Sequence, residues 1–250
     1  MRALRTLLIV VVVLGGLFVL ADRLALHFAE GEVADRLKTS ENLSATPDVT
    51  IAGFPFLTQV ATGTLDDVTI GIDDYEADTG AAAGDGAPSS IRIENLEARM
   101  KGVEFSGDFS SATAADATGT ARISYAELLK TAKAEPTQVA PGATAQVIGL
   151  SDGGDGKIKV ALKATVLGVR VPGPLYVMST VAVEDDTVKV HADALPKFGS
   201  IELGERTIRS ITDFQQRIDD LPGGIRLDKV EAAKNGVEIT VKGSDVKLAG

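Results

Sequence analysis

Apolar and polar residues alternate through most of the chain after residue 47, which is the pattern of β-strands that bury one face. Val49 and Ile51 begin this alternation, and a longer example runs over Ile158–Val166, opposite a row of lysines. The alternation changes phase after Asn95 and again at Leu167, as it does where a β-bulge adds one residue to a strand. Long strands with bulges predict a strongly twisted, curled sheet.

Two helices are expected among the strands. Ser124 and Glu127 have the spacing of a capping box and predict a short helix directly after Ser124. A longer helix is predicted over residues 205–221, because apolar residues recur there at every third or fourth position: Ile208, Ile211, Phe214, Ile218 and Leu221. Asn235-Gly236, between two alternating runs, predicts a terminal hairpin. The fold class is therefore α+β, with a curled, mainly antiparallel β-sheet and few helices to cover it.

The N-terminus predicts export. Arg2 and Arg5 precede Leu7–Ala21, which holds no charged residue. As a helix this segment rises about 22 Å, and the apolar residues before it extend it toward the roughly 30 Å of a hydrocarbon core. An uncleaved signal-anchor is favoured because the helical pattern continues beyond it. The alternative is a signal peptide that is cleaved after Ala21. In both cases the positive charges place the rest of the chain outside the cytoplasm.

The chain is therefore expected to have three parts. Residues 1–21 form the signal-anchor or signal peptide, and residues 22–40 form an amphipathic helical stalk. Residues 41–250 form the folded domain. Within that domain, residues 77–90 are small, Gly-rich and without periodicity, which predicts a mobile loop between two strands.

Composition narrows the choice of partners. The net charge is −10, no basic stripe stands out and aromatic residues make up 4% of the chain, so no nucleic acid is expected as a partner. The absence of cysteine excludes disulfide frameworks and thiolate metal sites. A domain of this charge is not expected to adhere to anionic lipids by electrostatics, so its contact with a membrane should depend on the N-terminal helix.

The motifs that suggest catalysis or metal binding are each incomplete. Gly149–Gly153 matches G-x-S-x-G, but that motif requires a helix after the serine and a strand-like alternation follows here. His191 is the sole general-base candidate in the domain, because His27 lies in the predicted stalk. Asp152 and Asp155 lack the closing glutamate of a calcium loop. We therefore expect a protein that is not an enzyme and has no catalytic residues, metal or cofactor.

One stretch is more specific. Residues 47–59 read PDVTIAGFPFLTQ, a strand that stops at Phe-Pro-Phe, where proline has no amide to donate to a sheet. Together with Gly63, Leu221–Gly224, Gly236–Ile239 and Gly243, this run resembles the LmeA-like phospholipid-binding proteins of actinobacteria, formerly a domain of unknown function. The likeness extends over roughly residues 20–248.

The resemblance implies a fold like one half of a BPI-type (TULIP) domain, in which a curled antiparallel sheet wraps a long helix and leaves an apolar groove. Relatives bind phospholipids, phosphoinositides among them, and in mycobacteria they support late steps of lipomannan assembly. The resemblance therefore implies a lipid carrier or accessory factor at the cell membrane or in the periplasm, with envelope biosynthetic enzymes as partners. The alternative is an envelope scaffold or adaptor with a filled core and no bound lipid.

The residues expected to touch lipid come from two segments: Phe54, Pro55, Phe56 and Leu57, and Ile208, Ile211, Phe214 and Ile218. The first segment has two interpretations. Either it forms a bent strand end at the mouth of the groove, where its aromatic rings meet lipid tails, or its rings fill the end of the core. In the first case Phe56→Ser should reduce lipid uptake without changing thermal unfolding. In the second case it should do the reverse.

Overall fold

The computed structural model describes residues 2–40, 42–78, 90–107, 111–131, 136–184, 187–193, 213–217 and 225–249. The helices in these residues are α1 (Arg2–Ser40), α2 (Phe56–Thr62) and α3 (Tyr125–Thr131). The first strands along the chain are β1 (Asp48–Ala52), β2 (Thr64–Asp78), β3 (Ser90–Phe105), β4 (Ala112–Ser124), β5 (Thr137–Ala140), β6 (Ala143–Gly154) and β7 (Lys157–Val166). The others are β8 (Val169–Arg170), β9 (Leu175–Glu184), β10 (Thr187–Ala192), β11 (Phe214–Arg217), β12 (Arg226–Ala233) and β13 (Gly236–Ala249).

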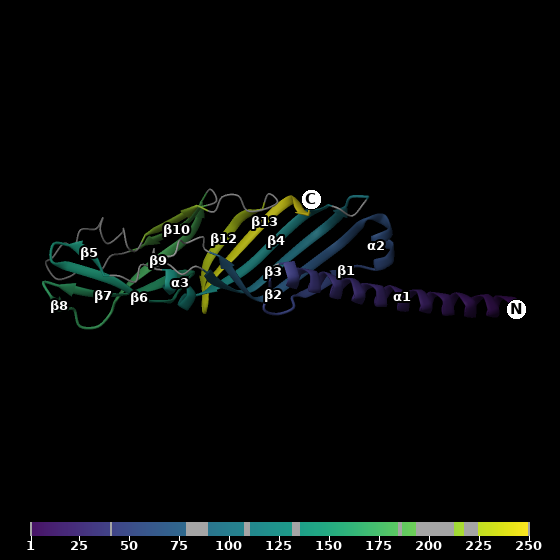
Figure 1. Ribbon diagram of the computed structural model, residues 1–250, viewed down its shortest axis with the longest axis horizontal. Coiled ribbons are helices and arrows are strands. Elements are labelled where there is room, and N and C mark those ends of the chain that lie inside the picture. Colours follow the sequence, from purple (N-terminus) through teal and green to yellow (C-terminus); the bar gives the residue numbers. More distant parts are fainter. Residues whose placement is uncertain are drawn as a thin grey trace.

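The strands form two antiparallel sheets. One has the order β1-β2-β3-β4-β13-β12, and the other has the order β11-β10-β9-β7-β6-β5 with β8 paired to β7. The two sheets follow one another along an elongated body, and α1 projects from the end where α2 lies (Figure 1). The fold class predicted from sequence, α+β with a curled antiparallel sheet and a long helix, is confirmed.

The first sheet bends along a line that crosses neighbouring strands. Buried residues there lie three positions apart instead of two: Leu65 and Val68 on β2, Val103 and Met100 on β3, and Ala114 and Ala117 on β4. The strand register brings these positions side by side, so the change of phase is shared by all three strands. Gly102 and Asp245 lie at the same level with φ of 58° and 54°. Such local departures from the pleat curl a sheet.

The long helix α1 covers one edge of this sheet. Leu26 packs into the core beside Ile51 and Phe56. The carboxylate of Glu30 accepts a hydrogen bond of 2.9 Å from the backbone N–H of Ile51, on the edge strand β1. An uncovered edge strand exposes a row of unpaired amides. The second half of α1 therefore packs against the folded body.

The bulge predicted at Asn95 is confirmed, because the β3–β4 register shifts between Glu94 and Glu97 and Asn95 has φ of 49°. The bulge predicted at Leu167 is wrong. Leu167 and Gly168 both have positive φ and form the tight turn between β7 and β8. A two-residue turn of this kind matches the twist of a hairpin, and it changes the phase of the alternation as a bulge does.

The prediction of a helix over residues 205–221 is wrong for residues 214–217, which the structure describes. Phe214–Arg217 form β11, with Phe214 opposite Val190 of β10, while residues 205–212 and 218–221 lie outside the described residues. Pairing with an available strand edge overrides local helical preference. The short helix predicted after Ser124 is confirmed as α3, and the N–H of Glu127 donates to Ser124 Oγ at 3.4 Å, which is one of the two hydrogen bonds of a capping box.

Two further expectations concern chain connections. The terminal hairpin is confirmed between β12 and β13, although its turn residues are Lys234 and Asn235. The loop expected over residues 77–90 is shorter at both ends, because Asp78 pairs with Ser90 in the β2–β3 ladder. Residues 79–89 of that loop lie outside the described residues.

Candidate functional site

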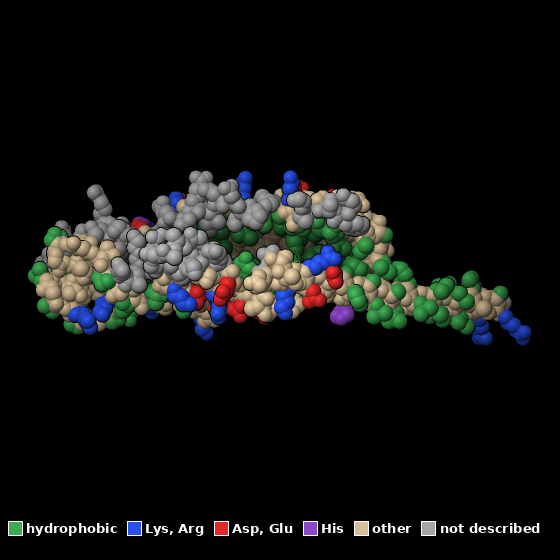
Figure 2. All heavy atoms as spheres, in the orientation of Figure 1, with side chains coloured by type: hydrophobic (Ala, Val, Ile, Leu, Met, Phe, Trp, Pro, Cys, Tyr) green, Lys and Arg blue, Asp and Glu red, His purple; other side chains and the backbone are tan. Residues whose placement is uncertain are grey.

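The concave face of the first sheet has a core at each end and a less covered stretch between them. The core beside α1 includes Val68, Met100 and Ala117, and the core beside the second sheet includes Tyr125 and Val237. Between them, apolar side chains of four strands are only half-buried: Ile70, Ile72, Leu96, Ala98, Ala121, Ile123, Ile239 and Val241. Figure 2 shows a recess lined by hydrophobic side chains in the part of the body where β4 and β13 lie in Figure 1. We refer to these eight residues as the hollow.

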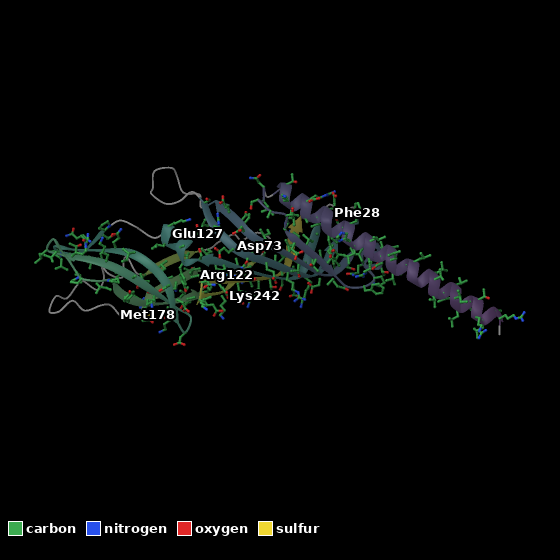
Figure 3. All side chains as sticks on the ribbon, turned by 90° about the horizontal axis from the view of Figure 1, so that it is seen from below. Phe28, Asp73, Arg122, Glu127, Met178 and Lys242 are labelled. Atoms are coloured by element: carbon green, nitrogen blue, oxygen red, sulfur yellow. The ribbon has the colours of Figure 1, made fainter. Side chains whose placement is uncertain are left out.

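Strand register places the hollow residues on one face. Ile70 lies opposite Ala98, and Ala121 lies opposite Ile239. Polar residues such as Thr120 and Lys242 alternate with the hollow residues along the strands and are exposed. Because successive side chains of a strand point to opposite faces, these polar residues lie on the convex face of the sheet. Lys242 is labelled in Figure 3, which views the body from below. The hollow is therefore lined by hydrocarbon, and charge is kept on the convex face.

The interval between the two cores is long enough for a lipid tail. Along β4 it runs from Ala117 in one core to Tyr125 in the other. These eight steps along a strand span about 26 Å at about 3.3 Å per residue. One leaflet of a bilayer has a hydrocarbon thickness of about 15 Å, half of the roughly 30 Å core. An extended acyl chain therefore fits within the interval between the two cores.

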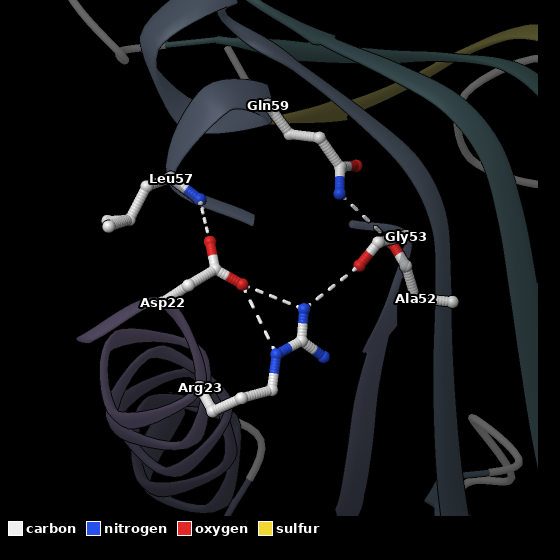
Figure 4. Close-up of polar contacts among 6 residues, drawn as sticks. All are labelled: Asp22, Arg23, Ala52, Gly53, Leu57 and Gln59. Carbon is white, nitrogen blue, oxygen red and sulfur yellow. Dashed lines mark hydrogen bonds and ion pairs between the residues drawn. The ribbon is translucent and has the colours of Figure 1, made fainter. Parts of the chain in front are cut away.

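A second feature, at the end where α1 leaves the body, fixes that helix to α2. Asp22 is the first charged residue after the apolar segment and is fully buried. Its Oδ1 accepts a 2.8 Å hydrogen bond from the backbone N–H of Leu57, at the start of α2 (Figure 4). Its Oδ2 pairs with the guanidinium of Arg23 at 2.8 Å, and that guanidinium reaches the carbonyl of Gly53 at 3.5 Å.

The electrostatics of Asp22 favour its charged form. Burial raises the pKa of this carboxyl, but the amide of Leu57 and the guanidinium of Arg23 act in the opposite direction. The net pKa lies below the usual value, so Asp22 is ionised wherever the domain is folded at neutral pH. A buried carboxylate with these partners ties α1 rigidly to α2.

Gln59 holds α2 on the sheet from the other side. This side chain is buried, and its Nε2 donates to the carbonyl of Ala52 at 3.4 Å. Its Oε1 accepts a 2.7 Å hydrogen bond from the N–H of Asp66. Sequence reasoning missed α2, since PFLTQVAT has no cap signal beyond Gly63, which ends the helix with φ of 76°. The apolar residues Phe56, Leu57 and Val60, at spacings of three and four positions, are the helical signal that the sequence offered.

The aromatic residues on either side of Pro55 separate into two environments. Phe56 is 6% exposed and packs in the core beside α1. Phe54 is 59% exposed, and its ring lies over the Arg23 guanidinium, 5.1 Å from it to the ring centroid. Leu57 is exposed on the outer side of α2 and Pro55 is half-buried. Neither sequence interpretation accounts for both rings.

Of the other residues predicted to touch lipid, Phe214 lies within the described part of the chain. Phe214 belongs to β11, at the edge of the second sheet. Ile208, Ile211 and Ile218 lie outside the described residues. Their contact with lipid stays a prediction. The hollow residues were missed because alternation alone does not say which part of an apolar face is left uncovered.

The motifs weighed for catalysis occupy ordinary β-structure. Ser151 lies within β6 opposite Lys159, so it does not sit on a strand-to-helix elbow. Asp152 Oδ1 accepts the N–H of Gly154 at 2.8 Å and caps the turn into β7. His191 Nδ1 lies 2.8 Å from a carboxylate oxygen of Asp213, and the imidazole is mostly exposed.

Comparison with known proteins relates the chain to a protein family. Residues 20–242 match the sequence profile of a family described as LmeA-like phospholipid-binding. No curated protein and no solved structure matches the chain. The matched range begins at the end of the apolar segment of α1 and includes every hollow residue.

Proposed function

Since the chain belongs to the LmeA-like phospholipid-binding family, we propose that it binds phospholipid by holding acyl chains in the hollow. The observation that carries the proposal is the band of half-buried apolar side chains between two separate cores. A filled core would bury these residues as fully as it buries Val68 or Val237. Each methylene that moves from water into the hollow contributes about 0.8 kcal/mol, so part of one acyl chain is enough for firm binding.

The proposal places the domain on the extracytoplasmic side of the membrane, with α1 as an uncleaved anchor. The helix runs without a break across Ala21 and Asp22. The apolar part of the helix is long enough to cross a membrane and is not buried inside the body. Docking of Asp22 and Leu26 into the body makes anchor and domain one rigid element. The alternative is that the segment is a signal peptide cleaved after Ala21. N-terminal sequencing of the protein isolated from cells distinguishes the two.

The cellular role that we propose is that of a lipid carrier or accessory factor in the assembly of envelope lipids or lipoglycans. A phosphoinositide is one candidate ligand, and envelope biosynthetic enzymes are the candidate protein partners. We propose no enzymatic step. These points are supported by the family and by the position of the domain next to its anchor.

Photo-crosslinking tests the binding site directly. The full chain is reconstituted in liposomes that contain a phospholipid with a diazirine in one acyl chain, and crosslinked peptides are mapped by mass spectrometry. Crosslinks to α1 act as an internal control for reconstitution. Crosslinks to peptides that carry Ile72, Leu96 or Ile239 are the expected result. Crosslinks confined to α1 would favour the scaffold or adaptor with a filled core.

A matched pair of variants separates occupancy from folding. Ala121→Trp places an indole in the hollow, whereas Thr120→Trp places one on the exposed face of the same strand. If the indole displaces about four methylenes, the loss is about 3 kcal/mol, or about 200-fold in affinity. Crosslinking in the hollow should fall for Ala121→Trp and persist for Thr120→Trp. The lipid that is extracted from the unmodified chain identifies the headgroup class.

A further inference from the structure

The end of the body from which α1 emerges carries exposed apolar side chains that no described residue covers. They are Leu24 and Phe28 on α1, Phe54, and Leu57 and Val60 on α2. We refer to these five residues as the interfacial surface. Phe28, labelled in Figure 3, is 81% exposed. Hydrophobic side chains continue from α1 onto this end of the body in Figure 2.

The structure leaves no linker between the apolar segment of α1 and this surface. Asp22 directly follows the segment and is hydrogen-bonded to Leu57 at 2.8 Å. Leu57 and Val60 are three residues apart on the outer side of α2, because Phe56 and Gln59 occupy its sheet-facing side. Any membrane that contains residues 6–21 therefore has α2 at its surface.

The length of the apolar segment points to the same arrangement. Residues 6–21 rise about 24 Å as a helix, which is about 6 Å short of the roughly 30 Å hydrocarbon core. A short segment is accommodated by drawing flanking groups toward the bilayer. The flanking groups available here are the apolar side chains of the interfacial surface, while Arg5 can extend its guanidinium toward the opposite headgroups.

We infer that the interfacial surface is a membrane-docking site, seated among the lipid headgroups and upper acyl carbons of the leaflet that α1 enters. This inference rests on the proposed role of α1 as an anchor. Docking is apolar, consistent with a chain whose net charge is −10. It fixes the orientation of the body, whose long axis then points away from the bilayer with the β7–β8 hairpin at the far end (Figure 1).

Single tryptophans test this orientation, because the chain contains none. Phe54→Trp and Val60→Trp probe the interfacial surface at two exposed positions, so both variants should fold. Val169→Trp is the matched control, exposed on β8 at the opposite end. Each full-length variant is reconstituted in vesicles of phosphatidylcholine and phosphatidylglycerol. Quenching is measured with phospholipids brominated on their acyl chains and, separately, with aqueous acrylamide.

The expected result is that brominated lipids quench Phe54→Trp and Val60→Trp several-fold more than Val169→Trp, with the reverse order for acrylamide. Equal acrylamide quenching at all three positions would overturn the inference, since the surface would then lie in water. Strong lipid quenching of Val169→Trp would also overturn it, since the body would then lie flat. Crosslinking in the hollow is read from other peptides, so failure of docking and failure of lipid binding are distinguishable.

Discussion

Truncating the two phenylalanines beside Pro55 should have opposite consequences for stability. Phe56 is 6% exposed and packs in the core with Leu26, Ile51 and Leu65. Phe→Ala at such a position removes the transfer free energy of the ring and leaves a cavity, which together cost about 3–5 kcal/mol. For a chain of this size each kcal/mol lowers Tm by about 2–4 °C, so Phe56→Ala should lower Tm by roughly 6–20 °C.

Phe54 supplies the matched control. Its ring is 59% exposed and its main contact is the Arg23 guanidinium at 5.1 Å. An exposed cation–π contact is worth about 0.5–1 kcal/mol, so Phe54→Ala should lower Tm by no more than about 4 °C. The two variants remove the same atoms from positions two residues apart, so the difference between them measures mainly the burial of Phe56.

Urea unfolding of the full chain in detergent micelles, followed by pulse proteolysis, measures the free energy of unfolding while α1 stays solubilised. A loss for Phe56→Ala below about 1 kcal/mol would refute the placement of this ring in the core. Equal losses for the two variants would refute the separation of their environments. Phe56→Ser is the variant that distinguishes the two interpretations of the sequence. Because the Phe56 ring is buried, we expect this variant to lower the free energy of unfolding.

Two further predictions concern the first sheet. A Cβ on Gly236 would lie 2.3 Å from the carbonyl oxygen of Ile123, so Gly236→Ala should separate β13 from β4. We expect urea unfolding to show a loss of about 1–3 kcal/mol or more. Gly149→Ala is the control and should change stability little, because its Cβ would have no neighbour nearer than 3.5 Å. The hydrogen bond from Arg99 lowers the pKa of Asp67 in the folded chain. The pair therefore stabilises the fold fully at pH values above the unfolded pKa of 3.8, and this stabilisation is lost as the pH falls through the lower pKa of the folded chain. Unfolding free energies measured from pH 6 to pH 3 should therefore fall less steeply for Asp67→Asn than for the unmodified chain.

Much of the fold follows from local patterns in the sequence. The alternation at Val49 and Ile51 gave β1, and Ser124 with Glu127 gave the start of α3. The phase change at Asn95 is a bulge, as expected. These features depend on side chains within a few positions of one another, and such interactions are encoded in short stretches. The family resemblance, carried by residues 47–59, is also local information.

Other features depended on contacts that a local pattern does not contain. Phe214–Arg217 lie within a run of helical spacing, yet these four residues form a strand because the edge of β10 is available to pair with them. The same change of phase is a bulge at Asn95 and a hairpin turn at Leu167, since only the neighbouring strand decides which one forms. Local spacing is compatible with more than one structure, and tertiary pairing selects among them.

By itself the sequence determined the apolar N-terminal segment, the α+β class, the strand alternation and the likeness to phospholipid-binding proteins. Only the tertiary structure decided which apolar side chains are covered. It buried Phe56 and left Phe54 at the surface, and it left Ala121 and Ile123 half-buried between two cores. It also joined Asp22 to Leu57, thirty-five residues apart. The physical reason is that burial belongs to the packing of distant segments, whereas hydrophobicity belongs to each residue alone.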